Sequence, residues 1–453
     1  MSSSSSIEPS PRPARWPPTF MKEVEAFADR LQSLSSAGLF WAIFVLAIAV
    51  RVSLLVLVHP PAEVQFAEMD KIARSLATHG TFADAYFLPT GPTAHHAPAY
   101  PFLLSLVFRA FGYGSAAVLA TAVMNFALAS LQYALMPILA DWADIPRSVG
   151  VTTGLIGALL PYRFLKEIRW DAALVGAASV VLVMVTTRWW RTREPSLLAT
   201  FLVGLAWGIG MMCSANLLPV FLVFVLLFAM VAHRRKRPRS WRLIVTLSAG
   251  VLLAIAPWTI RNYRELHSVM FIRSNFGLEF SLSNNPEAHV LGVDNDTIGF
   301  TNTYFQRHHP GINRGEAEEI LRIGEAAYNR ALLHQTMDWI RANPRQFMAL
   351  TLSRIAYFWV TPYKTQVWKN FLLTPWTILA ACGLWVMIRR QRELGLLILA
   401  LWIGFPMVHY LIQMDTRYRY PIDWTFALLA VLAVHAFWHR GVSRKHQPPM
   451  LMA

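Results

Sequence analysis

The sequence predicts an all-α polytopic membrane protein with about ten transmembrane helices and further helices along its outer face. Hydrophobic residues make up 55% of the 453 residues and charged residues 15%, against about 45–50% and about 25% in soluble domains. The apolar residues gather in long runs, such as 40–58 and 243–258, and runs of roughly 18 or more are typical of membrane spans. The basic residues gather instead in short loops between these runs.

The balance of charges points to a membrane rather than to a nucleic acid. The formal net charge is +15, which in a soluble protein would favour nucleic-acid binding. Here the charge follows the positive-inside pattern of membrane proteins, so we predict membrane lipids, and no nucleic acid, as partners. The two cysteines, Cys213 and Cys382, lie in apolar segments and predict neither a disulfide nor a metal site.

Residues 1–37 are predicted to form a cytoplasmic disordered tail and an amphipathic helix. Ser and Pro dominate residues 1–18, a composition typical of disorder. Phe20, Val24 and Phe27 then recur at helical spacing among charged residues, which is typical of a helix lying on the membrane surface. The first apolar run begins too late and is too long for a cleavable signal, so we expect an uncleaved anchor.

The Lys and Arg residues orient the predicted helices, because short cytoplasmic loops are enriched in them. The basic segments are 188–193, 234–242, 389–392 and the cytoplasmic tail 439–453. Both termini are then cytoplasmic, and the transmembrane domain 38–438 carries outer loops at 59–113 and 262–371. The predicted spans are 38–58, 114–140, 146–161, 171–188, 198–213, 216–233, 243–261, 372–388, 395–412 and 420–438.

Two apolar segments are predicted to lie on the outer face without crossing. Pro98–Phe111 has only about 14 residues, too few to span comfortably, and 346–360 fails by the same argument. If either crossed, the basic loops that follow would lie outside. Within the long outer loop a further helix is predicted from about 316 to 340, and Asn343-Pro344 should end it.

Three polar clusters fall on the predicted outer face: one after the first span, one before the span at 171–188, and one before the last span. Their candidate functional residues are Glu68, Asp70, His95, His96, Tyr100, Arg163, Lys166, Asp171, Arg417 and Arg419. Arg51 lies inside the first span, where a charge is costly. It either faces a polar partner or cavity, or reaches the lipid headgroups by snorkelling.

The sequence does not indicate a metal site. His95-His96 and His308-His309 are adjacent pairs, and neighbouring side chains diverge on a helix or a strand. The run 294–296 offers oxygen ligands but lacks the spacing of a calcium loop. We therefore predict no cofactor with certainty; a divalent metal is compatible with these residues but not indicated by them.

Several motifs resemble one family of membrane enzymes. The runs IARSL at 72–76, HGTF at 79–82 and GPTAHHAPAYPFLLSLVF at 91–108 are similar to the first outer loop of membrane-embedded glycosyltransferases with the GT-C fold. The resemblance is greatest to the bacterial relatives of dolichyl-phosphate-mannose protein mannosyltransferases and to the aminoarabinose transferase of lipid A. It continues through APWTIRNYRELHSVMFIRSNFGLE, SNNPEAH, GEAAYNRALLHQTMDWIRANP and RYRYPID, and so covers about residues 38–438.

The resemblance implies a hexosyl- or pentosyltransferase of the plasma (inner) membrane. Its donor would be a polyprenyl-phosphate-linked sugar, and its acceptor a protein, a lipid or a glycan on the outer face. Phosphate is already a good leaving group, so the enzyme needs a base for the acceptor hydroxyl and arginines for the phosphate. Direct attack on the anomeric carbon would invert its configuration.

The resemblance also implies roles for particular residues. The key acid of the family begins the first outer-loop helix, which corresponds here to Glu68; many relatives have an Asp or an Asp-Glu pair slightly upstream, where this chain has Gln65 and Phe66. An Arg of the RYRYP motif is associated with the donor phosphate, so Arg417 and Arg419 are the predicted ligands. The further candidates are Arg51 for the phosphate and, for the substrate pocket, His95, His96, Tyr100, Arg163, Lys166 and Asp171.

Glu68 and Asp70 compete for the role of general base. On a helix their side chains point about 200° apart, so both cannot face one site. Asp70 and Arg74 have the i,i+4 spacing of a surface ion pair, and Glu68 could pair similarly with Lys71. We therefore predict Glu68 as the base and keep Asp70 as the alternative.

Two other functions remain as alternatives. A polytopic transporter or lipid flippase would be expected to show inverted repeats, broken helices and acids near the membrane midplane. A polysaccharide ligase or polymerase would rely on Arg and His in a large outer loop more than on a carboxylate in the first one. The acidic first loop and the scarcity of charges within the spans favour the glycosyltransferase.

Overall fold

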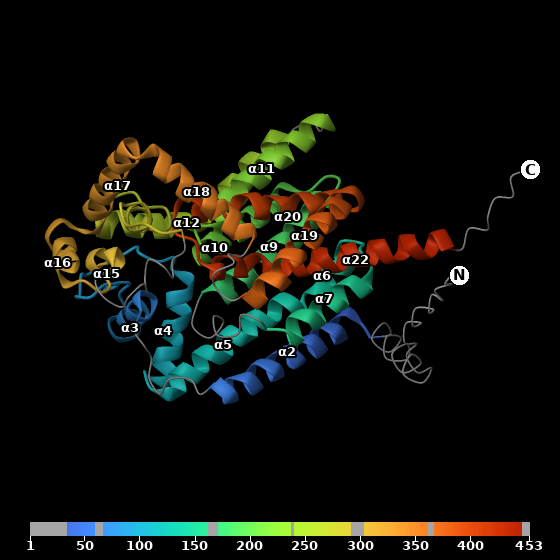
Figure 1. The fold of residues 1–453 in the computed structure, drawn as a ribbon, viewed down its shortest axis with the longest axis horizontal. Coiled ribbons are helices and arrows are strands. Elements are labelled where there is room, and N and C mark those ends of the chain that lie inside the picture. Colours follow the sequence, from blue (N-terminus) through green and yellow to red (C-terminus); the bar gives the residue numbers. More distant parts are fainter. Residues whose placement is uncertain are drawn as a thin grey trace, which may run out of the picture.

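The structure of the protein is a computed structural model that describes residues 34–58, 67–161, 171–236, 240–290, 303–360 and 367–445. Every regular element in these ranges is a helix (Figure 1), which confirms the predicted all-α class. The predicted amphipathic helix before residue 34 lies outside the described residues.

In chain order the helices are α2 (Ser36–Val58), α3 (Glu68–His79), α4 (Ala99–Phe111), α5 (Ser115–Ala134), α6 (Met136–Trp142), α7 (Arg147–Leu159), α9 (Ala172–Arg191), α10 (Leu197–Cys213), α11 (Leu217–Arg234), α12 (Ser240–Leu266), α13 (Phe276–Ser283), α15 (Tyr304–His308), α16 (Arg314–Ile323), α17 (Glu325–Ala342), α18 (Pro344–Trp359), α19 (Val367–Arg390), α20 (Arg392–Gly404), α21 (Met407–Leu411), the 3-10 helix η1 (Thr416–Ile422) and α22 (Asp423–Lys445).

Seven segments of the described chain are long and apolar enough to cross a membrane, which makes this a multi-pass membrane protein. They are Ser36–Leu57, Ser115–Trp142, Ala172–Arg191, Leu217–Arg234, Ser240–Leu266, Arg392–Leu411 and Tyr418–Trp438. The predicted number of about ten is not confirmed, because α7, α10 and α19 are not among these seven. With 13 and 17 residues, α7 and α10 fall short of the ~20 residues that a bilayer core of ~30 Å requires.

The spans run along the long axis of the molecule, and the outer-loop helices gather at one end. Figure 1 shows α3, α15 and α16 at the end opposite the start of α2 and the finish of α22. Contacts also join loops that the sequence predicts to be cytoplasmic. Arg191 pairs with Asp144, and Gln391 donates a hydrogen bond of 3.1 Å to the carbonyl of Asp144.

The segment predicted to lie on the outer face forms α4, which runs across the direction of α5 in Figure 1. Its 13 residues are too few to cross a bilayer core of about 30 Å. One face of the helix, with Tyr100, Leu104 and Phe108, is buried in a cluster with Met69 and Ala73 of α3. This packing fixes α3, and therefore Glu68, against α4.

The single helix predicted over 316–340 is wrong, because the structure contains two helices there. α16 ends at Ile323 and α17 begins at Glu325, with Gly324 between them at φ +82°. Only glycine adopts this left-handed conformation at little cost, so Gly324 ends the first helix. The predicted end at Asn343-Pro344 is confirmed, since α17 finishes at Ala342 and α18 starts at Pro344.

Small residues allow α10 and α12 to pack in close backbone contact. A Cβ atom added to Gly204 would overlap the carbonyl oxygen of Leu247, and one added to Gly250 would overlap that of Phe201. Helices within a bilayer gain little from hydrophobic burial against one another, so close van der Waals packing of small residues is a main source of their association.

Gly250→Val is therefore expected to lower the stability of the protein, because the new side chain would separate α12 from α10. Overpacking of this kind typically costs about 1–3 kcal/mol. The measurement is the melting temperature of the purified protein in detergent. Leu252→Val changes an exposed position on the same helix and is the matched control; equal melting temperatures for the two variants would contradict the packing argument.

Candidate functional site

A cavity of about 700 Å³ lies where the loops that the sequence predicts to be outside meet the spans. Its polar lining includes three carboxylates, Glu68, Asp171 and Glu279, together with several histidines and one arginine. A second part of its wall is apolar and comes from α11 and from the segment around α21, with Leu218, Phe405 and Ile412. The cavity therefore suits a ligand with a polar head and an apolar tail.

Glu68, the first residue of α3, faces a histidine from the other outer loop. Its Oε1 lies 3.7 Å from Nε2 of His309, whose side chain is 5% exposed, while that of Glu68 is 25% exposed. Nδ1 of His309 accepts a hydrogen bond of 3.0 Å from the backbone N–H of Gly311. Because Nδ1 is the acceptor, the ring proton of a neutral His309 lies on Nε2, facing the carboxylate.

Asp70 has a different task at the same end of α3. Its Oδ2 accepts a hydrogen bond of 3.1 Å from the backbone N–H of Ala67, so it caps the first turn of the helix. Of the two acids only Glu68 lines the cavity in the described part of the chain. The predicted divergence of the two side chains accounts for this difference.

Lys71 connects α3 to two loops beside Glu68. Its ammonium group donates to the backbone carbonyls of Tyr86, at 2.9 Å, and Gly311, at 3.4 Å. Burial lowers the pKa of Lys71, and the nearby Glu68 opposes this effect. One lysine thus joins the helix that carries Glu68 to the turn that orients His309.

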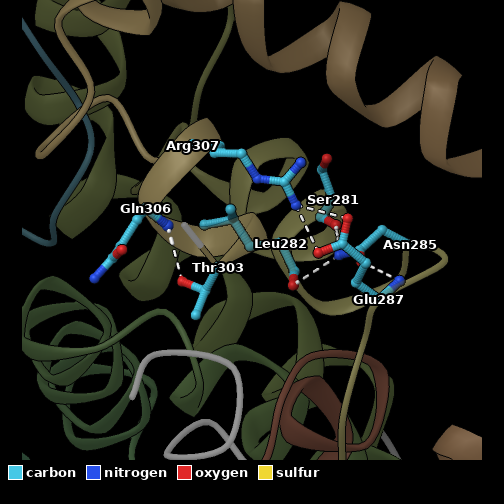
Figure 2. A network of polar contacts seen from close by, with 7 residues as sticks. All are labelled: Ser281, Leu282, Asn285, Glu287, Thr303, Gln306 and Arg307. Atoms are coloured by element: carbon cyan, nitrogen blue, oxygen red, sulfur yellow. Dashed lines mark hydrogen bonds and ion pairs between the residues drawn. The ribbon is translucent and has the colours of Figure 1, made fainter. Parts of the chain in front are cut away.

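An ion pair positions the short helix that precedes His309. Figure 2 shows Arg307 of α15 donating to both carboxylate oxygens of Glu287, each at 2.6 Å. The amide of Asn285 accepts from the backbone N–H of Glu287 at 3.0 Å, and Thr303 caps α15 through a bond of 3.3 Å from Gln306 N–H. Exposed ion pairs contribute little stability, so we assign this network a positional role.

Arg273 places a positive charge in the cavity wall, next to the two predicted pocket histidines. Its Nε donates to the carbonyl of His95 at 3.1 Å, and its NH2 lies 3.4 Å from Nδ1 of His96. It is the one Arg or Lys among the described residues of the lining. Burial, reinforced by Arg273 and His309, lowers the pKa of both His95 and His96 well below its ordinary value, so both rings are neutral near pH 7.

Two of the predicted site residues are engaged in helix packing instead. Tyr100 is buried under α3 and accepts a hydrogen bond of 2.8 Å from Asn125. Arg51 is fully buried in α2 and donates to the carbonyl of Gly157 on α7 at 3.3 Å, so it faces a polar partner rather than the lipid headgroups. Neither residue lines the cavity in the described part of the chain, whereas Asp171 does.

Arg419 is buried beside the cavity rather than in its lining. Its Nε donates to Oδ1 of Asp423 at 3.1 Å, and its guanidinium lies 3.6 Å from the ring centroid of Phe426. Its neighbours Tyr418 and Tyr420 line the cavity. The side chain of Arg417, and all of Arg163 and Lys166, lie outside the described residues.

Sequence reasoning missed Arg273, Glu279 and the pairing of His309 with Glu68. Arg273 and Glu279 both lie within the run 256–279 that resembles the GT-C family, which was the available signal. His309 was considered only as one of an adjacent histidine pair. No group of side chains suited to hold a metal ion is found among the residues that the structure describes.

No family model and no curated protein matches this sequence, but solved structures match the fold. The apo oligosaccharyltransferase of Archaeoglobus fulgidus aligns with a TM-score of 0.52 at 13% identity, over 90% of this chain and 51% of that one. The same archaeon's oligosaccharyltransferase AglB, in complex with an inhibitory peptide and a dolichol-phosphate, aligns with a TM-score of 0.52 at 14% identity, over 91% and 52%.

The chain thus spans about half the length of these archaeal enzymes. At such low identity the match concerns architecture, and it confirms the predicted GT-C fold of membrane-embedded glycosyltransferases.

Gly311→Ala is expected to displace the carboxylate of Glu68 without unfolding the protein. An added Cβ would lie 2.6 Å from Oε1 of Glu68, which ends a flexible side chain, and 2.9 Å from Nδ1 of His309, so the carboxylate must move and the ring must shift slightly. A structure of the variant should show the Glu68–His309 distance increased beyond 3.7 Å. Gly315→Ala is the control, because its Cβ would meet only Asn313, at 3.3 Å; an unmoved Glu68 in the first variant would contradict the argument.

Proposed function

We propose that the protein is a glycosyltransferase that moves a sugar from a polyprenyl phosphate to a hydroxyl group of an acceptor on the outer face of the membrane. The observation that carries the proposal is one cavity in which Glu68, paired with His309, and the cation Arg273 meet an apolar wall. The dolichol-phosphate bound to the archaeal oligosaccharyltransferase of the same fold supports a polyprenyl-phosphate donor.

In this proposal the donor binds across the two parts of the cavity. The apolar wall of Leu218, Phe405 and Ile412 would receive the first isoprene units, and Arg273 the phosphate. A guanidinium suits phosphate oxygens because it presents paired N–H groups to them. Arg273 replaces Arg419 as our first candidate for this role, since Arg419 is already paired with Asp423; Arg417 remains a second candidate.

Glu68 is the proposed general base. It would take the proton of the acceptor hydroxyl while the hydroxyl oxygen forms a bond to the anomeric carbon. The bond from that carbon to the phosphate oxygen breaks, and the polyprenyl phosphate leaves with the bonding electrons. The new bond forms opposite the old one, so the configuration inverts. His309, with its proton on Nε2, would keep the carboxylate oriented.

The same proposal includes the orientation of the chain. We place both termini in the cytoplasm and the cavity at the outer face of the plasma (inner) membrane. The positive-inside bias of the loops supports this, as do the contacts of Asp144 with Arg191 and Gln391, which bring together three of the loops that this bias assigns to the cytoplasm.

Glu68→Gln tests the proposal. The amide keeps the shape of the side chain but cannot take a proton, so turnover should fall at least about a hundredfold while donor binding persists. The measurement is consumption of a panel of polyprenyl-phosphate sugars by the purified protein. Asp70→Asn, at the residue that caps the helix and does not line the described part of the cavity, should retain nearly full activity. An active Glu68→Gln enzyme would remove Glu68 from the mechanism.

Arg273→Ala should weaken the binding of polyprenyl phosphate about tenfold to a hundredfold, because charge-assisted hydrogen bonds contribute about 1.5–3 kcal/mol. The measurement is a binding titration in detergent. Arg314→Ala is the control: this arginine lies on the exposed surface of α16 and pairs with Glu318 at 2.8 Å. Equal affinities for wild type and Arg273→Ala would exclude Arg273 as the phosphate ligand.

A further inference from the structure

The carboxylate of Glu325 is buried behind the cavity and saturated with hydrogen bonds. Glu325 begins α17 and is 5% exposed. Its Oε1 accepts from the backbone N–H of Ala94, at 2.9 Å, and from the hydroxyl of Ser274; its Oε2 accepts from the hydroxyls of Thr93 and Tyr86, the latter at 3.2 Å. These donors occupy both oxygens, so Glu325 has no capacity left to bind a substrate directly.

One of these donors links Glu325 to His95. Tyr86 has a single hydroxyl proton, which it donates to Glu325. The hydroxyl oxygen lies 3.2 Å from Nδ1 of His95 and can therefore only accept there. His95 consequently carries its ring proton on Nδ1, and its Nε2 is left with a lone pair, on a side chain that lines the cavity.

The neighbouring His96 has the opposite tautomer. A guanidinium only donates, so Nδ1 of His96 accepts from Arg273 and its ring proton lies on Nε2. This Nε2 is buried and has no hydrogen-bond partner among the described residues. A buried donor without a partner is costly, which points to a ligand atom that completes the site. Both rings line the same cavity and pack edge to face, with centroids 4.7 Å apart.

We propose that His95 and His96 form a donor–acceptor pair that binds a substrate hydroxyl group, and that Glu325, acting through Tyr86, is the positioning residue that sets this pair. A hydroxyl group both donates and accepts, so it would donate to Nε2 of His95 and accept from Nε2 of His96. The inference rests on the proposed function in assigning this hydroxyl to the transferred sugar or to the acceptor. The tautomers themselves follow from the contacts of the protein alone.

Tyr86→Phe tests the arrangement, since it removes the hydroxyl and leaves the other three hydrogen bonds of Glu325 in place. In the full-length protein with ¹⁵N-labelled histidine, the ring shifts should show a proton on Nδ1 of His95 and on Nε2 of His96. The variant should change the ¹⁵N ring shifts of His95 and leave those of His96 unchanged. A proton on Nε2 of His95 in the wild type, or an unchanged His95 in the variant, would overturn the inference.

The chain supplies a matched control in a second Tyr–Glu–His group. Tyr328 donates to Glu316 at 2.7 Å, and Glu316 lies 3.0 Å from Nδ1 of His308. These residues do not line the cavity in the described part of the chain. Tyr328→Phe should therefore leave the His95 ring shifts and ligand binding unchanged; a change as large as that of Tyr86→Phe would reduce the effect to general loosening of the outer loops and overturn the inference.

Binding measurements identify the source of the hydroxyl. The probes are undecaprenyl phosphate and the undecaprenyl-phosphate sugar that wild type consumes from the panel. Tyr86→Phe should weaken the sugar-bearing lipid about three- to tenfold, as expected for one hydrogen bond, and leave the bare lipid unchanged. A rise in KM for the acceptor with unchanged donor binding would assign the hydroxyl to the acceptor instead. Equal weakening of both lipids, or no change in any of these values, would overturn the inference.

Failure of the proposed function can be distinguished from failure of this inference. A wild-type protein that binds neither lipid would refute the glycosyltransferase, while the ring shifts would still decide the tautomers. Glu325→Gln is a second variant, because its amide cannot accept at both positions and should disturb His95 in the same direction as Tyr86→Phe. If Glu325→Gln does not fold, Tyr86→Phe alone decides the outcome.

Discussion

The packing of the two long loop segments around the cavity depends on one buried carboxylate. Glu325 joins two outer-loop segments to the start of α17 by accepting hydrogen bonds from Thr93, Ala94 and Ser274. A buried charge is tolerated only when its hydrogen bonds are made, so these segments cannot separate without exposing an unsatisfied carboxylate. Arg273 and His95 are direct neighbours of these donors in the chain. Their position in the cavity wall therefore follows from this connection.

A second set of contacts fixes the part of the cavity lining that carries Glu68 and His309. Lys71 attaches the start of α3 to the carbonyl groups of Tyr86 and Gly311, and the Gly311 N–H sets the ring of His309. The absence of a side chain on Gly311 is what leaves room for the carboxylate of Glu68. Both groups of residues line the cavity, together with apolar residues such as Leu218 and Phe405. A polar reaction centre thus lies directly beside a surface suited to lipid.

The bilayer imposes a second constraint, which acts on the helices below the cavity. In a bilayer every backbone N–H and C=O group must be hydrogen-bonded within the protein, and a helix meets this requirement within one segment. Helix association then depends on close packing and on buried polar links. Gly204 and Gly250 provide the first between α10 and α12, and Arg51 provides the second between α2 and α7. Arg419 is similarly neutralised by Asp423. These charges stabilise the scaffold and are therefore less available to a ligand.

The sequence alone determined the all-α membrane class, the positions of most helices and the short helix 99–111, and it singled out Glu68, one of the three acids that line the cavity. Hydropathy and helix signals are local, so they can be predicted from neighbouring residues. Only the tertiary structure shows where Arg273, His309 and Glu325 lie. It also shows that Tyr100 packs under α3 and that Arg419 pairs with Asp423, so neither lines the described part of the cavity. Ala94 and Glu325 lie 231 residues apart in the chain. No local pattern predicts such a contact, because it exists only once the outer loops have packed together.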